Sequence, residues 1–180
     1  MSYPRKTTLY VCGLSLLACV ILLFCTSDWI GRILYPIHYK EDIKASAALY
    51  KVDPLLVAAI IRVESNYKPD KVSVKDAKGL MQILPSTAHW LIEMNGQKPI
   101  EDHRLLEQSV NIEVGTLYLS VLARQFHDTI ELMAAESKVA FIAAAYNAGP
   151  GNVSKWYEQG LWDGDAYELS GIPFGETRHY

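Results

Sequence analysis

The hydrophobic positions of this 180-residue chain follow two different patterns. Near the start, residues 9–26 form one apolar run, LYVCGLSLLACVILLFCT, without a charged side chain. From residue 41 onward, apolar residues recur at the spacing of three and four that is typical of a helix face. No alternating run is long enough to indicate a strand. The pattern therefore predicts an apolar N-terminal helix followed by an all-α globular part.

Several segments of the globular part combine helical spacing with residues that favour the beginning or the end of a helix. One begins with Asp53 as a cap and Pro54 in the first turn, and another begins at Ser137 and ends at Gly149. Residues 163–180 contain too much glycine and proline to form one helix. The expected helices are 41–51, 53–66, 85–96, 105–126, 137–149 and 152–160.

The apolar run is close to membrane-spanning length, because helical residues rise ~1.5 Å each and a run of this length covers ~27 Å of a ~30 Å hydrocarbon core. No small-x-small cleavage site follows it, which favours an uncleaved anchor over a removed signal peptide. A resemblance to a lipoprotein processing site around Cys19 leaves lipidation as the alternative. We expect residues 1–27 to be a lipid-contacting anchor, 28–39 a juxtamembrane connector and 40–180 one domain.

Charge and cysteine content narrow the kinds of function and of binding site that the globular part can have. Without Arg5 and Lys6, 15 basic and 20 acidic residues remain, a net charge of −5, so no basic stripe for nucleic acid is expected. All three cysteines, Cys12, Cys19 and Cys25, lie in the apolar run. The globular part therefore has no disulfide and no thiolate metal ligand.

A lone carboxylate stands at the end of one expected helix. Glu64 follows Ile61, Ile60 and Val57 by three, four and seven residues, so it shares the stripe that faces the core. Desolvation raises the pKa of such a carboxyl group above ~4.3 and lets it hold a proton near neutral pH, as a general acid must. A solvated glutamate one turn beyond the buried part is the alternative interpretation.

Four motifs occur in an informative order: ESNYKPDKVSVKDAKGLMQILPSTA, NIEVGTLYL, AAYNAGPGNVSKW and IPFGETRHY. In this order they resemble the lytic transglycosylase domain of the soluble lytic transglycosylase type, over about residues 40–180. The resemblance implies a lysozyme-like, mostly helical fold that acts on peptidoglycan glycan strands. It also implies that Glu64 is the single catalytic acid and base.

The implied reaction cleaves the β-1,4 bond between N-acetylmuramic acid and N-acetylglucosamine and leaves a 1,6-anhydro end. The N-acetyl oxygen of the substrate attacks the anomeric carbon, so a second carboxylate, a metal and a cofactor are not required. Because peptidoglycan lies beyond the cytoplasmic membrane, we expect a single-pass membrane protein with its domain outside the cytoplasm.

Residues that follow Glu64 in the first motif suit a sugar site. The Ser73 hydroxyl can bond to the carboxylate or to an N-acetyl group, although an ordinary turn serine is equally consistent. Gly79 allows close backbone approach, and Gln82 offers both donor and acceptor atoms, which the resemblance places in the glycan cleft. We include Met81 among the substrate-binding residues, with core filling as the more frequent role of methionine.

The later motifs supply three further candidates. The resemblance places Tyr146 beside the catalytic glutamate and makes it the second catalytic residue, whereas a core tyrosine with a satisfied hydroxyl is the alternative. Asn147 either assists at the same site or caps the helix end. Glu176 matches a cleft-edge position near the peptide stem, and a salt bridge to Arg178 would explain it equally well. We also expect aromatic residues such as Trp156 to hold sugars.

Two departures from the resembled pattern and two rival functions remain. Asp76 replaces a glycine common in the loop, and Tyr67 stands where phenylalanine is frequent.

A hydrolase of the goose-type lysozyme kind would need a second carboxylate, from Asp70, Asp76 or Glu176. A wall-binding protein that lost its chemistry is the other rival.

Overall fold

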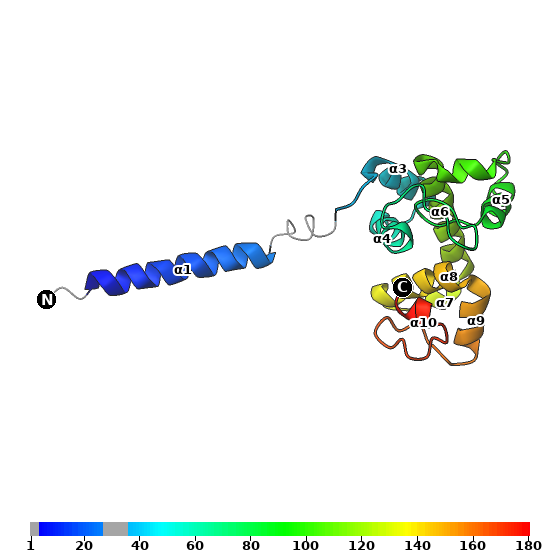
Figure 1. Cartoon of the computed structure of the whole chain (residues 1–180). Coiled ribbons are helices and arrows are strands. Elements are labelled where there is room, and N and C mark those ends of the chain that lie inside the picture. Colours follow the sequence, from blue (N-terminus) through cyan, green and yellow to red (C-terminus); the bar gives the residue numbers. More distant parts are fainter. Residues whose placement is uncertain (1–3, 27–35) are drawn as a thin grey trace. The chain divides into compact units, whose positions relative to one another are not determined.

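The computed structural model describes residues 4–26 and 36–180, and the chain forms two compact units, Met1–His38 and Tyr39–Tyr180 (Figure 1). In the first unit, helix α1 covers Pro4–Thr26, and the apolar side chains described within it are exposed, with Leu9 at 72% and Leu22 at 67%. Among the residues that the structure describes, no helix combines the length and the apolar character needed to cross a membrane. Most of the predicted connector 28–39 lies outside the described residues.

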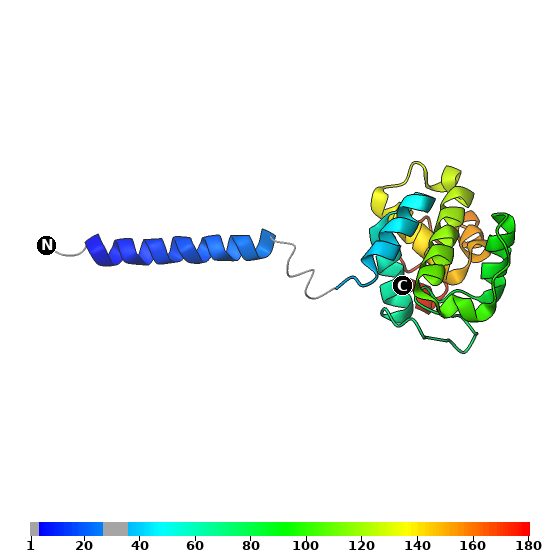
Figure 2. The ribbon, with the colours of Figure 1, turned by 90° about the horizontal axis from the view of Figure 1, so that it is seen from above.

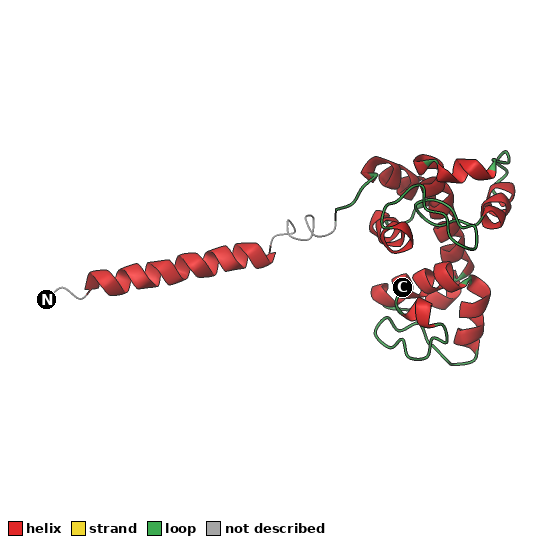
Figure 3. Cartoon of the chain, viewed as in Figure 1, coloured by secondary structure: helices red, strands yellow, loops and turns green. Residues whose placement is uncertain are grey.

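The second unit is built from helices and loops (Figure 3), and within residues 36–180 strand pairing is limited to isolated bridges. The all-α prediction is therefore confirmed. In chain order its helices are α3 (Lys40–Tyr50), α4 (Pro54–Ser65), α5 (Pro85–Met94), η1 (Asp102–Leu106), α6 (Gln108–Gln125), α7 (His127–Ile130), α8 (Ala135–Ala148), α9 (Pro150–Glu158) and α10 (Gly175–Arg178).

One expected helix is divided in the structure. The range 105–126 was expected to be continuous, but a 3₁₀ turn ends at Leu106 and α6 begins at Gln108, with Glu107 extended between them. The Arg104 guanidinium donates to the Glu107 carboxylate at 3.0 Å, and Leu105 is fully buried. The Leu105 carbonyl accepts from the buried Asn111 side chain at 2.7 Å, so it is not available to a helical N–H, and helical spacing cannot reveal such a contact.

Helix α6 forms the centre of the domain and contacts α3, α5, α8 and η1 (Figures 1 and 2). It buries side chains around much of its circumference, among them Ile112, Leu117, Leu119 and Leu122. A helix that is apolar on most sides is stable only when other helices surround it. The end of α8 packs directly on this centre, where the rings of Tyr146 and Tyr118 meet, whereas α4 packs on α3, which in turn contacts α6.

Candidate active site

A cleft of about 660 Å³ lies where the end of α4, the loop before α5 and the end of α8 meet. Residues of α5, α6 and α10 complete its lining. Of the residues predicted to form a site, the cleft brings together Glu64, Ser73, Gln82, Tyr146, Asn147 and Glu176. Met81 is fully buried beneath it. The structure thus gathers residues from distant motifs, while their individual roles remain predictions.

Glu64 lies in the last turn of α4. The helix begins with Asp53, whose carboxylate accepts the Leu55 N–H at 2.8 Å, and ends at Asn66 in the left-handed conformation, φ 51°. Ile60 and Ile61 are buried on the same side of the helix as Glu64, which is itself partly buried and faces the cleft. The carboxyl group therefore stands where the apolar wall of α4 meets the cleft.

Four influences act on the pKa of Glu64. Burial raises it most strongly, and the negative charge of Glu176 adds to the increase. A hydrogen bond from Tyr180 and the positive charge of Lys71 act in the opposite direction. The net pKa lies above that of an ordinary glutamate. A raised pKa increases the protonated fraction near neutral pH, which suits a proton donor.

Tyr180 is the hydrogen-bond partner of this carboxyl group. Its hydroxyl donates to Glu64 Oε1 at 2.8 Å, across 116 positions of sequence, and burial raises the pKa of the phenol far above its ordinary value. Tyr180 was not among the predicted site residues, because the motif IPFGETRHY contributed only Glu176 to them. The available signal was a phenol two residues after Arg178 in a motif already assigned to the cleft edge.

Tyr146 lines the same cleft as Glu64, and its hydroxyl is satisfied by a backbone carbonyl. Its hydroxyl donates to the Met81 carbonyl at 2.8 Å, not to the carboxyl group, and its ring lies 5.2 Å from that of Tyr118. Burial, with a contribution from the charge of Glu64, raises the pKa of Tyr146 well above its ordinary value. The phenol is thus a neutral group close to Glu64 that fixes the backbone at Met81.

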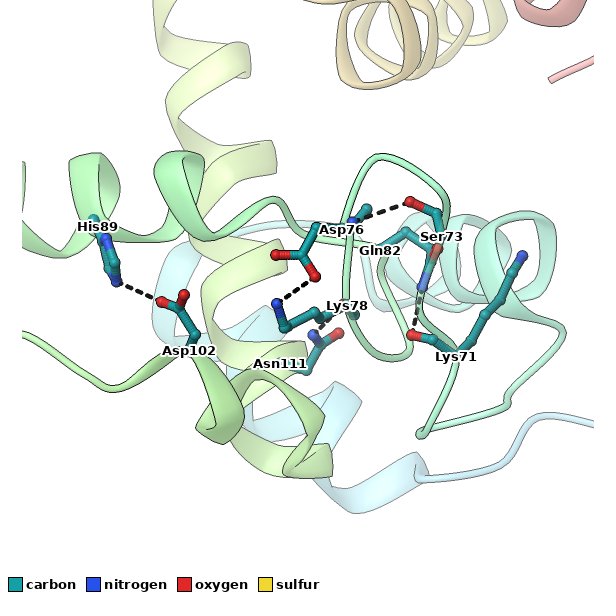
Figure 4. Close-up of polar contacts among 9 residues, drawn as sticks. Lys71, Ser73, Asp76, Lys78, Gln82, His89, Asp102 and Asn111 are labelled. Carbon is teal, nitrogen blue, oxygen red and sulfur yellow. Dashed lines mark hydrogen bonds and ion pairs between the residues drawn. The ribbon is translucent and has the colours of Figure 1, made fainter.

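The loop between α4 and α5 turns sharply at Gly79 and Gln82, which have φ values of 78° and 49°. A side chain at Gly79 would collide with Asn111, so glycine is required there for space as well as for conformation. The Gln82 amide nitrogen donates to the Lys71 carbonyl at 3.0 Å (Figure 4) and to the Gly79 carbonyl at 2.9 Å. Its carbonyl oxygen remains an acceptor for a ligand.

Ser73 braces the tip of the same loop. Its Oγ accepts the Ala77 N–H at 3.0 Å, which is the turn role considered above, and its hydroxyl proton remains able to donate into the cleft. Asp76 adopts the left-handed conformation, φ 64°, in which glycine is favoured, and its carboxylate pairs with Lys78 at 2.7 Å (Figure 4). The departure at Asp76 is therefore compensated by a local ion pair.

The other departure is also accommodated by a hydrogen bond. Tyr67 is buried, and its hydroxyl donates to the Ala58 carbonyl at 3.1 Å. The extra polar group of tyrosine relative to phenylalanine is therefore satisfied, as burial requires.

Met81 lies in the core, with its side chain against Gly115 of α6. Burial leaves no side-chain atom of Met81 exposed to a substrate, which favours the core-filling interpretation over direct binding. Its backbone is held at both polar groups, because its N–H donates to Asn111 Oδ1 at 2.7 Å and its carbonyl accepts from Tyr146.

Asn147 and Glu176 lie where α8 and α10 meet. The Thr177 hydroxyl donates to Asn147 Oδ1 at 2.7 Å, which links the two helices. The alternative of an ion pair between Glu176 and Arg178 is not observed among the described residues; Glu176 lines the cleft. Its charge acts on Glu64, as described above.

The aromatic residue expected to hold sugars is not available in this structure. Trp156 is only 4% exposed, and its ring packs edge-on against Phe174 with centroids 5.0 Å apart. That expectation was wrong because Trp156 faces the core side of α9. Tyr118 of α6 lines the cleft instead, and the helical pattern of α6 did not distinguish it from its buried neighbours.

Comparison with known families gives one match over most of the domain. The family model of the transglycosylase SLT domain matches residues 41–167. A soluble lytic murein transglycosylase of Salmonella typhimurium is 36% identical over 152 residues, covering 81% of this chain and 22% of that protein. Membrane-bound lytic murein transglycosylase C of Photorhabdus laumondii is 31% identical over 157 residues, covering 79% of this chain and 43% of that protein.

Solved structures agree with the sequence matches. The 70 kDa soluble lytic transglycosylase of Escherichia coli superimposes with a TM-score of 0.70 at 34% identity, covering 81% of this chain and 22% of that one. The chain therefore spans about a fifth of the length of these soluble relatives.

Proposed function

The chain belongs to the transglycosylase SLT domain family, and from this premise we propose that it is a peptidoglycan lytic transglycosylase. Its substrate is the glycan strand, cut at the β-1,4 bond between N-acetylmuramic acid and N-acetylglucosamine. The observation that carries the proposal is the Glu64 carboxyl group, partly buried in a cleft and with a raised pKa.

Glu64 acts twice in the proposed reaction. As an acid it protonates the leaving glycosidic oxygen while the N-acetyl oxygen of the muramic residue attacks the anomeric carbon. As a carboxylate it then takes the proton of the C6 hydroxyl, whose oxygen forms the 1,6-anhydro bond and displaces the N-acetyl oxygen. No water is consumed, and Glu64 ends protonated as it began.

The neighbouring groups have supporting roles. Tyr180 orients the Glu64 carboxyl group, and Tyr146 keeps a neutral hydroxyl close to it. We assign Ser73, Gln82 and Asn147 to contacts with the sugars. Met81 contributes through its position in the backbone and not through direct contact.

Glu176 supports one alternative function. Glu64 and Glu176 are the two carboxylates among the described cleft residues, whereas Asp76 is paired with Lys78 and Asp70 does not line the cleft. A hydrolase of the goose-type lysozyme kind would use Glu176 to activate water. The products separate the two reactions, because transglycosylase products are lighter than hydrolysis products by one water.

The test combines a variant with mass spectrometry. Wild-type protein should release 1,6-anhydro fragments from purified murein, and Glu64→Gln should lower the rate by about 10²–10⁴-fold while binding to the sacculus persists. Glu93→Gln, an exposed change on α5, serves as the matched control and should leave the rate unchanged. Undiminished turnover by Glu64→Gln would remove the catalytic assignment, and hydrated products would favour the hydrolase.

We also propose that residues 1–27 anchor the protein in the cytoplasmic membrane, with 28–39 as connector and 40–180 as an extracytoplasmic catalytic domain. Support comes from the uncharged run 9–26 and from the exposed apolar side chains of α1, which water solvates poorly. An anchor would also keep a domain of net charge −5 near its substrate without electrostatic attraction.

A further inference from the structure

Residues 71–77 form one edge of the cleft, which we call the lysine lip. Its basic side chains line the cleft, and its acidic side chain does not. Lys71 and Lys75 line the cleft, whereas Asp76 of the same segment does not. Figure 4 shows Asp76 directed toward Lys78 and Lys71 extending away from that pair. The ion pair of Asp76 with Lys78, whose side chain is only 13% exposed, keeps the acidic group out of the cleft.

The two cleft lysines differ in their contacts. Lys71 donates a hydrogen bond to the Glu64 backbone carbonyl, so its ammonium is partly engaged. Lys75 is exposed, and within residues 36–180 the structure gives it no ion pair. Val74, directly before it, is fully exposed and also lines the cleft. The lip thus offers an ammonium group beside an apolar side chain.

Resting on the proposed function, we propose that the lysine lip binds the peptide stem of the substrate through a stem carboxylate. The sugar rings of a peptidoglycan strand are uncharged, so a cation in the cleft has no partner among them. The carboxylates of the peptide substituents provide one, and the methyl groups of their alanine residues suit contact with Val74. Lys75 is the specificity-determining residue of this contact, and Lys71 supplements its charge.

The experiment compares wild-type protein and a Lys75 variant on two forms of the substrate. Soluble murein fragments with free stem carboxylates are compared with the same fragments after conversion of those carboxylates to amides. On the free acids, Lys75→Gln should lower kcat/KM by about two- to fivefold, mainly through KM, as expected for an exposed ion pair. On the amidated fragments, the difference between wild type and variant should shrink toward zero.

Two matched variants separate charge from structure. Lys75→Arg should retain most of the preference for free acids, because it keeps the charge. Lys155→Gln, an exposed change on α9 outside the cleft lining, should have no effect on either substrate.

An equal loss on both substrates would overturn the role of the lysine lip while leaving the proposed function intact. Cleavage of neither substrate by wild-type protein would instead overturn the proposed function. In that case the dissociation constants of the two fragments for wild type and Lys75→Gln decide the binding role by the same comparison.

Discussion

At the scale of single residues, opposing influences set the pKa of the Glu64 carboxyl group. Burial and Glu176 raise its pKa, and the Tyr180 hydrogen bond and Lys71 lower it. A general acid is active in its protonated form, so kcat/KM falls as pH rises through the pKa of the free enzyme. This fall is the alkaline limb of the kcat/KM profile. Substitution of a neighbour that lowers the pKa of Glu64 should move the limb to higher pH, and substitution of a neighbour that raises this pKa should move it to lower pH.

Tyr180→Phe removes a hydrogen bond that stabilises the charged carboxylate. The pKa of Glu64 should rise, and the alkaline limb of the kcat/KM profile should move to higher pH. The rate at the optimum should fall by less than in Glu64→Gln, because the acid itself remains. A limb that stays in place or moves to lower pH would show that the hydrogen bond is not retained in solution.

Glu176→Gln removes a like charge that opposes ionisation of Glu64. The pKa of Glu64 should fall, and the alkaline limb should move to lower pH, opposite to the change in Tyr180→Phe. The same pH series on murein fragments measures both variants. If Glu176 instead activated water, its substitution would reduce turnover at every pH without this displacement.

At the scale of elements, a buried asparagine joins three segments. Asn111 of α6 is 1% exposed; its Oδ1 accepts the Met81 N–H, and its Nδ2 donates to the Lys78 and Leu105 carbonyls at 2.8 and 2.7 Å. The loop before α5 and the end of η1 are therefore fixed to the central helix. This explains why Gly79, which contacts the Asn111 amide, has no room for a side chain.

Asn111→Ala should destabilise the domain by about 2–4 kcal/mol, because it leaves buried polar groups of the backbone without partners. Urea denaturation at equilibrium measures the change. Asn95→Ala, an exposed change at the end of α5, should alter the free energy of unfolding by less than about 0.5 kcal/mol. Equal small effects in both variants would contradict the role of Asn111 as a link.

At the scale of the whole molecule, the proposed anchor and domain predict a topology. If the N-terminus faces the cytoplasm and the domain lies outside, protease added to intact spheroplasts should remove the domain and leave a small membrane fragment. Detection with an antibody against the domain and with a tag at the N-terminus follows both parts. Full protection of the domain would contradict the proposed topology, and domain found free in the medium would indicate cleavage of the N-terminal segment.

The sequence by itself was sufficient for the features that depend on local periodicity. Apolar spacing of three and four residues indicated an all-α domain, and the position of Glu64 after Val57, Ile60 and Ile61 placed it on the buried stripe of α4. These features follow from the geometry of one helix, so no distant residue is needed to infer them. The ordered motifs added the family, which the comparisons with known proteins support.

Only the tertiary structure decided which groups meet in the cleft. Tyr180 reaches Glu64 across 116 positions, Tyr146 bonds to the Met81 carbonyl, and Trp156 faces the core. Contacts of this kind depend on how helices far apart in the chain pack around α6, and helical spacing contains no information about the partner of a given face. For the same physical reason, the separation of Lys75 from Asp76 across the lysine lip became visible only in the folded loop.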